Sequence, residues 1–266
     1  MSHFTYTNNK KPAASPERKT VRIGVFVPSQ CQMLDAAAID IFGSLGVEYL
    51  TMVDGILPPV VIDSAPHVEI RYIGIVPAGG IIRMTASLNV VATNHFDDAE
   101  VAPGKLDIVY VPGPDPFAEF PADALAWLRR QAETEGVDVL SVCSGIFVCG
   151  AAGIVKDKAI CGPRDLQPLI MQKGWGAKSL KGGELRWIQD GNFWSSGGVT
   201  NGNDLVAAYC RAKSDIFPRP LVELICEQLG VGDRPQKYLH DMTAEKHIQD
   251  LAAMYGAKNT SEVAAA

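Results

Sequence analysis

Apolar residues along this chain fall into two alternating patterns, which predict the order of its secondary structure. Short runs rich in Val and Ile predict β-strands, at residues 21–27, 60–63, 68–76, 81–91, 106–111, 137–142 and 158–161. Apolar positions at helical spacing predict helices, at residues 34–45, 121–135, 146–152, 164–174, 202–214 and 220–229. Residues 184–196 predict two strands that turn at Asp190-Gly191. Helices that separate buried strands indicate a parallel sheet covered on both faces, so we expect an α/β fold.

The same patterns predict how the chain is divided. Residues 1–20 are polar and rich in Asn, Lys, Pro and Ser, which is typical of a disordered tail. Residues 21–230 carry the alternating strands and helices of the α/β domain, and residues 231–266 form an extension. One apolar stripe at helical spacing in this extension comprises Ile248, Leu251, Ala252 and Tyr255. Such a stripe most often contacts a core and less often a partner.

Composition then excludes several functional classes. Hydrophobic residues make up 47% of the chain, and the net charge of −6 argues against non-specific nucleic-acid binding, which needs clustered Lys and Arg. No apolar run approaches the ~20 residues of a membrane-spanning helix. The polar N-terminus lacks the apolar stretch of a secretory signal, so we expect a cytoplasmic protein. The six cysteines form no C-x-x-C pair and the five histidines are scattered, which favours neither a disulfide framework nor a metal site.

Residues 137–145 are the most informative segment for function. A β-branched run ends at Cys143, and Ser144-Gly145 turns the chain into an apolar helix. Such a strand-to-helix turn presents a side chain at the end of a sheet, and the helix N-terminus favours a thiolate there. Cys143 is therefore a candidate nucleophile, although a free cysteine is also commonly a small buried hydrophobe.

Three segments are expected to meet at the carboxyl edge of the sheet, where ligands bind in open parallel sheets. These are residues 28–35, residues 112–116 and the Cys143 turn. Together they supply a thiol, a carboxylate and backbone N–H groups, which is sufficient for covalent or acid–base chemistry without a cofactor. Two alternatives stay open: Asp35 could cap a helix that begins at Ala36, and Ser144 could serve only to shape the turn.

With these segments the chain resembles the ThiJ/PfpI superfamily, also called the DJ superfamily, over about residues 21–215. The motifs that carry the resemblance are VRIGVFV at 21–27, MLD at 33–35, DIVYVPG at 107–113, VCSG at 142–145, AAG at 151–153, WIQDGN at 187–192 and SGGVT at 196–200. The resemblance implies a flavodoxin-like three-layer sandwich of the class I glutamine amidotransferase-like type, and a homodimer. It is strongest to the branch that looks like isonitrile hydratases. That branch places its carboxylate at Asp35, its nucleophile at Cys143 and a hydroxyl neighbour at Ser144.

Two departures from the family pattern change the expected pocket. The family commonly has Pro-Gly-Gly where this chain has Pro112-Gly113-Pro114, and proline has no N–H to donate to an oxyanion. The Ser144 N–H would remain, with Gly113 as a second donor. Related sequences often carry Thr-His where this chain has Cys161-Gly162, so a Cys–His dyad is unsupported. Arg164, which follows soon after, could bring a guanidinium to the pocket. Gly113, Pro114 and Arg164 are thus the candidate substrate-binding residues.

The resemblance implies an enzyme without metal or organic cofactor that acts on a small-molecule substrate. In this hypothesis a Cys143 thiolate attacks an isonitrile, Asp35 acts as general acid or base, and the hydro-lyase product is an N-substituted formamide. We expect Asp35 within hydrogen-bond reach of the Cys143 sulfur, because both residues should follow neighbouring parallel strands.

Two other functions fit the same residues. One is a cofactor-independent lyase, isomerase or cyclase that acts on a larger metabolite. The other is a non-catalytic redox sensor, in which Cys143 is oxidised to a sulfinic acid that Asp35 hydrogen-bonds.

Overall fold

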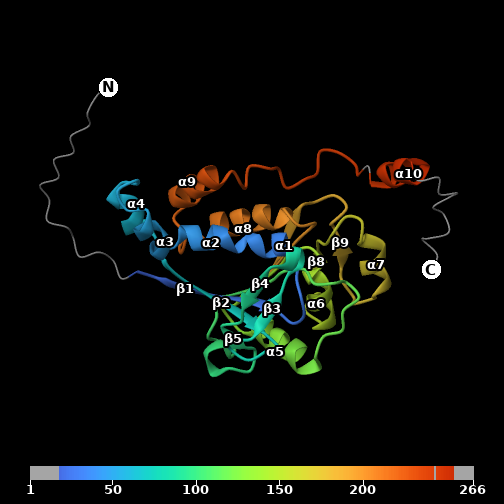
Figure 1. Cartoon of the computed structure of the whole chain (residues 1–266), viewed down its shortest axis with the longest axis horizontal. Coiled ribbons are helices and arrows are strands. Elements are labelled where there is room, and N and C mark those ends of the chain that lie inside the picture. Colours follow the sequence, from blue (N-terminus) through green and yellow to red (C-terminus); the bar gives the residue numbers. More distant parts are fainter. Residues whose placement is uncertain (1–17, 243, 255–266) are drawn as a thin grey trace, which may run out of the picture.

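The computed structural model describes residues 18–242 and 244–254 of the chain (Figure 1). Within these residues, seven strands form a central sheet in the order β10-β11-β7-β6-β1-β2-β5. Neighbouring strands are parallel except for β10 and β11, which form a hairpin. The strands are β1 Thr20–Val27, β2 His67–Gly74, β5 Asn94–His95, β6 Ile108–Val111, β7 Asp138–Ser141, β10 Trp187–Asp190 and β11 Phe193–Ser196. The predicted α/β fold with a mostly parallel sheet is confirmed.

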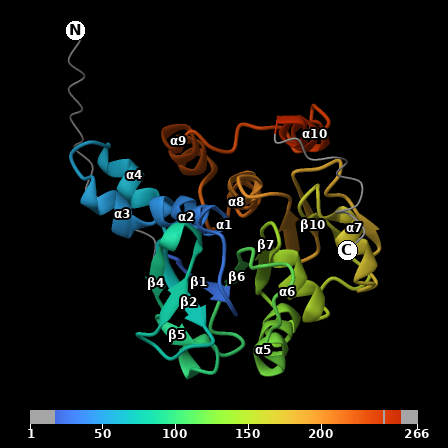
Figure 2. The same cartoon turned by 45° about the vertical axis from the view of Figure 1, so that its right-hand side comes forward.

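Helices cover both faces of this sheet and give three layers (Figure 2). One face packs against α1, α2, α8 and α9, and the other packs against α5 and α6. Successive strand residues point to opposite faces, so Val25 belongs to the first hydrophobic cluster and Phe26 to the second. The helices are α1 Met33–Ala37, α2 Ile39–Leu45, α3 Val47–Met52, α4 Pro59–Ser64, α5 Ala122–Glu133, α6 Gly145–Ala151, α7 Gln167–Gln172, α8 Asn201–Ala212, α9 Arg219–Leu229 and α10 Ala244–Met254.

Residues 60–63, predicted as a strand, instead lie in helix α4. Proline occupies the first turn of this helix, where its fixed φ suits a helix and its missing N–H costs nothing. Val60 is 69% exposed, so this apolar run lies on the surface rather than in the sheet. The strand prediction was wrong because a short apolar run has no period that separates strand from helix.

Two other predicted strands form small sheets outside the central one. Residues 81–91 form a hairpin of β3 Ile81–Arg83 and β4 Asn89–Val91. The strand predicted at 158–161 is β8 Ala159–Ile160, which pairs with β9 Ser179–Leu180. The two-residue strand β5 at the sheet edge was not predicted, because it is too short to show a pattern.

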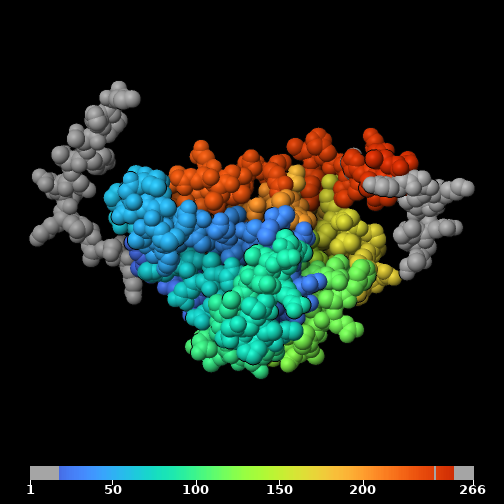
Figure 3. All heavy atoms as spheres, viewed as in Figure 1, coloured from blue at the N-terminus to red at the C-terminus, as the bar shows by residue number. Residues whose placement is uncertain are grey.

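The C-terminal extension crosses the helical face as an irregular segment and ends in α10, at one side of the molecule (Figures 1 and 3). No described residue of α10 is buried, and Ile248 and Leu251 are 53% and 54% exposed. The core contact is therefore not found at Ile248 and Leu251, while Ala252 is half-buried, and the alternative of a partner surface stays a prediction. Tyr255 of the stripe and residues 1–17 of the predicted tail lie outside the described residues. The homodimer stays a prediction.

Among the helices described, none has both the length and the apolar character needed to cross a membrane.

Candidate functional site

The predicted strand-to-helix turn at Cys143 is present, and its backbone is unusual. Cys143 lies between β7 and α6 with a φ of 56°, in the left-handed region that residues other than glycine rarely adopt. A Cβ added to Gly145 would lie 2.2 Å from the carbonyl oxygen of Val111 on the neighbouring strand. Glycine at 145 therefore lets α6 begin directly against β6, and this places Cys143 at the carboxyl edge of the sheet.

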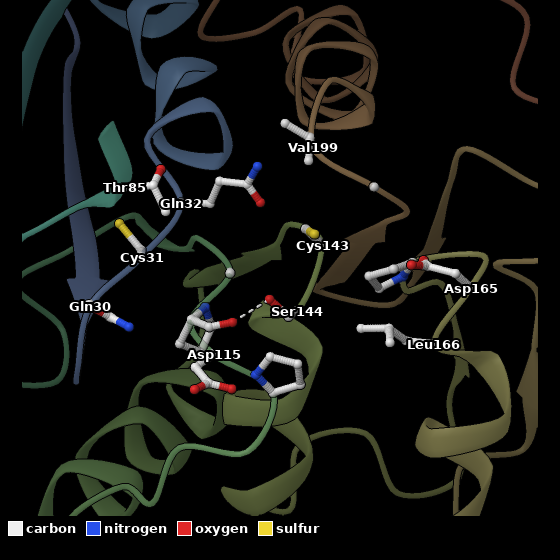
Figure 4. A pocket seen from close by; sticks show the side chains of 15 residues that line it. Gln30, Cys31, Gln32, Thr85, Asp115, Cys143, Ser144, Asp165, Leu166 and Val199 are labelled. Atoms are coloured by element: carbon white, nitrogen blue, oxygen red, sulfur yellow. Dashed lines mark hydrogen bonds between the residues drawn. The ribbon is translucent and has the colours of Figure 1, made fainter. Parts of the chain in front are cut away.

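A cavity of about 470 Å³ opens at this edge (Figure 4). Its walls come from residues 30–32, 85, 113–116, 143–144, 163, 165–166 and 198–199. The cavity lies over β1 and β6, where the strand order reverses direction, the usual position of a ligand site in such sheets. The three predicted segments therefore do meet at one site.

Asp35 lies fully buried in the first turn of α1. Its Oδ2 accepts a hydrogen bond of 3.2 Å from the Gly113 N–H. The Tyr110 hydroxyl donates to the Asp35 main-chain carbonyl at 2.5 Å. Helix α1 begins at Met33 and its N-cap position is Gln32, so the alternative that Asp35 caps a helix is wrong. Its carboxyl is fully buried and does not itself line the cavity, but it contacts Gly113 and Cys143, which do.

Asp35 and Cys143 face each other across one intervening strand. The sheet places β6 between β1 and β7, so the expectation that Asp35 and Cys143 follow neighbouring strands is wrong. By distance and angle, Asp35 Oδ1 has no hydrogen-bond partner among the described residues. The Cys143 thiol is nevertheless close enough to act as a hydrogen-bond donor that lowers the pKa of the carboxyl.

Burial dominates the protonation of this pair. It raises the pKa of Asp35 to about 7, despite the opposing effects of the Cys143 thiol and the Gly113 N–H. Burial, followed by the negative charge of Asp35, raises the pKa of Cys143 to about 12, while the N–H groups of Val199 and Ser144 lower it. The resting sulfur is therefore a thiol at neutral pH. This corrects the expected thiolate, because burial outweighs the helix N-terminus.

Ser144 and the Gly113-Pro114 loop fix each other. The Ser144 hydroxyl donates to the Pro114 carbonyl at 2.5 Å. A Cβ added to Gly113 would lie 2.3 Å from Asp35 Oδ2 and 2.5 Å from Ser144 Oγ, so only glycine fits there. The Gly113 N–H already holds Asp35, and it is not the free oxyanion donor that the sequence suggested. Gly113 and Pro114 do line the cavity, as predicted.

Arg164 does not line the cavity, in contrast to the sequence prediction. Its guanidinium lies 4.2 Å from the centre of the Tyr238 ring and donates to the His240 carbonyl at 3.0 Å. Tyr238 lies more than seventy residues further along the chain, so no local pattern around Arg164 could indicate this partner.

Sequence reasoning missed three parts of the cavity wall. Cys31 and Gln32 belong to the loop already singled out, where only Asp35 was selected. Thr85 comes from the β3–β4 hairpin and has no motif of its own. Val199 lies in the SGGVT motif, but its N–H acts as a main-chain group, which no side-chain pattern reveals. Across residues 18–242 and 244–254 no histidine lines the cavity, and no cluster of three or more His, Cys, Asp or Glu side chains could hold a metal ion.

Comparisons with known proteins agree with this architecture, although no family model matches the chain. The isonitrile hydratase of Pseudomonas putida is 29% identical over 174 residues, which cover 63% of this chain and 69% of that protein. A ThiJ/PfpI family protein from Pseudomonas syringae has a TM-score of 0.62 and 17% identity, with 92% of this chain and 94% of that chain covered.

Two further solved structures share the fold. Drosophila melanogaster DJ-1beta has a TM-score of 0.58 at 14% identity, with 80% of this chain and 98% of that chain covered. An AraC family transcriptional regulator from Pseudomonas putida also has a TM-score of 0.58, at 15% identity, with 79% of this chain and 99% of that chain covered. At such identities the likeness shows the flavodoxin-like fold, which proteins of different function share.

Proposed function

We propose that this chain, which belongs to the ThiJ/PfpI superfamily, is an enzyme that hydrates isonitriles to N-substituted formamides. The observation that carries the proposal is the pairing of the Cys143 thiol with a buried Asp35 carboxyl whose pKa is about 7. A carboxyl with this pKa accepts and returns protons near neutral pH, as general acid–base catalysis requires. The similarity to the Pseudomonas putida isonitrile hydratase supports this reaction over others that the fold could host.

In the first step the thiol adds to the terminal carbon of the isonitrile. The Asp35 carboxylate takes the proton as the S–H bond breaks, and the sulfur electron pair forms the new C–S bond. Asp35 then returns the proton to the same carbon, which gives a thioformimidate, R–N=CH–S–Cys143. The proton moves from sulfur to carbon by way of Asp35 while the C–S bond forms, so no free thiolate has to accumulate at neutral pH.

In the second step water adds to the thioformimidate carbon. Asp35 takes a proton from the water as the C–O bond forms and passes it to the substrate nitrogen, which gives R–NH–CH(OH)–S–Cys143. Asp35 then takes the hydroxyl proton as the C–S bond breaks and returns it to the sulfur, and R–NH–CHO leaves. Overall, one isonitrile and one water give one N-substituted formamide, and Cys143 and Asp35 return to their starting states. The negative charge that a classical oxyanion site stabilises is not required in the first step, which is compatible with Pro114 in place of a donor.

The charges of the cavity wall favour some substrates over others. Asp115 and Asp165 line the cavity, whereas no Lys, Arg or His among the described residues does so. Carboxylate-bearing isonitriles would meet like charge at the entrance, and amine-bearing ones would meet opposite charge. We therefore expect neutral and cationic isonitriles to be hydrated several-fold faster than anionic ones of equal size. The Asp115→Asn/Asp165→Asn double variant should reduce this preference.

The test is a panel of neutral, amine-bearing and carboxylate-bearing isonitriles incubated with the protein, with formamide detected by NMR. The wild-type protein should form formamide, and Cys143→Ala should not. Absence of formamide with every member of the panel, or equal formamide from Cys143→Ala, would overturn the proposal.

Burial of the sulfur argues against the redox-sensor alternative. Sensor cysteines have a low pKa and are accessible, whereas Cys143 is 8% exposed and its thiol is protonated at neutral pH. Mass spectrometry after mild peroxide treatment separates the two functions, because a sensor would accumulate sulfinic acid at Cys143.

A further inference from the structure

The segment that follows α9, residues 231–242, crosses over α8 towards the cavity end of the sheet (Figures 1 and 2). We call it the C-terminal strap. Its backbone pairs with the chain before β10: the Arg186 N–H donates to the Gln236 carbonyl at 2.7 Å, and the Tyr238 N–H donates to the Glu184 carbonyl at 3.0 Å. The middle of the strap is thus attached to the chain before β10 by main-chain hydrogen bonds.

Two strap side chains hold the turn that joins β11 to α8. The Tyr238 hydroxyl accepts a hydrogen bond of 2.5 Å from Asn201 at the start of α8. Arg234 donates to the Thr200 main-chain carbonyl at 2.7 Å and pairs with the nearly buried Asp204 at 2.6 Å. The turn, residues 197–200, is therefore held from outside by the strap.

Two guanidinium groups contact the ring of Tyr238. The guanidinium carbons of Arg164 and Arg186 lie 4.2 Å and 4.6 Å from the ring centre. A Cβ added to Gly197 would lie 2.6 Å from the Tyr238 hydroxyl, so the turn passes close to that oxygen. These cation–π contacts restrict movement of the ring away from the turn.

The inner side of the same turn contacts Cys143. The Cys143 N–H donates to the Gly197 carbonyl at 3.1 Å. Gly198 and Val199 line the cavity beside Cys143, and the Val199 N–H lowers the pKa of the Cys143 thiol. Val199 adopts this position with a φ of 24°, which a β-branched residue rarely does. Such a conformation persists only where the surroundings enforce it.

We propose that Tyr238 and Arg234 are positioning residues that hold the turn at 197–200 against Cys143, where the Gly197 carbonyl accepts the Cys143 N–H and Val199 lines the cavity beside the sulfur. The proposal rests on the proposed function for the role of Cys143. The consequence is that the C-terminal strap, which is distant from Val199 along the chain, controls the reactivity of the Cys143 thiol without contacting it.

The test measures how fast iodoacetamide alkylates Cys143 at a series of pH values, with mass spectrometry as the readout. The variants are Tyr238→Phe, which keeps the ring and removes the hydroxyl, and Arg234→Ala. Lys237→Ala is the matched control, because Lys237 lies on the same strap with an exposed side chain. Alkylation of Cys31 in the same sample reports on general opening of the cavity, since no N–H group is found on its sulfur among the described residues.

One weakened hydrogen bond should reduce alkylation of Cys143 about three- to tenfold at a given pH and move its pH profile upward by about half to one pH unit. The alkylation rate of Cys31 should be unchanged in these variants, and the alkylation rate of Cys143 should be unchanged in Lys237→Ala. An unchanged profile in Tyr238→Phe would overturn the proposal, as would an equal fall at Cys31 or in Lys237→Ala. If Arg234→Ala does not fold, because it leaves Asp204 unpaired, Tyr238→Phe decides alone. Alkylation needs no isonitrile, so this result and the failure of hydration are distinguishable.

Discussion

Two thiols share the cavity, and they differ in how the backbone surrounds them. Cys31 lies in the loop after β1 and Cys143 in the turn after β7, and Figure 4 shows both on the wall of one pocket. Both are buried, and burial followed by the charge of Asp35 raises the pKa of each to about 12. The two thiols therefore have about the same pKa, and at Cys143 this value already includes the lowering effect of two N–H groups.

The two thiols differ in the conformation of their main chain and in the N–H groups near the sulfur. Cys31 lies in extended backbone beside the hairpin, where its carbonyl accepts the Thr85 N–H at 3.1 Å. Cys143 lies in a left-handed turn, with the N–H groups of Val199 and Ser144 on its sulfur. Hydrogen bonds to the charged form favour that form. N–H groups on the sulfur are therefore the main-chain feature that distinguishes Cys143, the proposed nucleophile, from Cys31.

The largest expected effect comes from the group that both thiols share. Asp35→Asn keeps the shape of the side chain but cannot exchange a proton, so turnover of an isonitrile should fall by about 10²–10⁴-fold. Alkylation of both thiols should rise in the same variant, because the negative charge that raises their pKa is gone. Turnover close to that of the wild type would reject Asp35 as the acid–base group.

The pH dependence of turnover tests the same carboxyl in the wild-type protein. Asp35 must be deprotonated to accept the thiol proton, and its pKa is about 7. The value of kcat/KM should therefore rise with pH up to about 7 and level off above it, with a fall of about tenfold per pH unit well below 7. A profile that is flat between pH 5 and 8 would contradict the assignment. Asp35→Asn is the control, since its residual activity should lack this inflection.

A smaller effect tests the difference between the two thiols. Limited treatment with iodoacetamide should label Cys143 several-fold faster than Cys31, because Cys143 is the more exposed residue, at 8% against 2%, and two N–H groups stabilise the thiolate that forms there. Mass spectrometry of the digested protein gives the ratio. Cys31→Ser should leave the labelling of Cys143 unchanged. Faster labelling of Cys31 would contradict both reasons.

The parts of the site that the sequence predicts are those set by local backbone. The turn at Cys143 follows from a β-branched run that ends before Ser144-Gly145, and the structure reproduces it. The apolar run at 60–63 has no turn motif of this kind. Pro59 precedes it in the first turn of helix α4, where proline is well suited. Local sequence therefore predicts a feature where one residue type strongly restricts the chain.

The parts that the sequence does not predict depend on contacts between distant segments. Asp35 resembles a helix cap in sequence, but its role depends on Gly113, which approaches from another strand. The sequence around Arg164 allows its side chain to reach the pocket, but its guanidinium packs against the Tyr238 ring instead. The place of β6 between β1 and β7 depends on where the chain returns to the sheet, and no single segment records it.

The left-handed backbone of Cys143 implies that the fold gives up conformational energy to keep a side chain there. A residue with a Cβ at such a φ is disfavoured by about 1–2 kcal/mol, and glycine is not. The free energy of unfolding of Cys143→Gly should therefore exceed that of Cys143→Ala by about 1 kcal/mol, even though glycine removes more contacts. Chemical denaturation of the two inactive variants measures this difference. If Cys143→Ala is the more stable variant, the left-handed backbone costs a side chain nothing at this position. If Cys143→Gly is the more stable variant, chemistry and thermodynamic stability favour different residues at position 143.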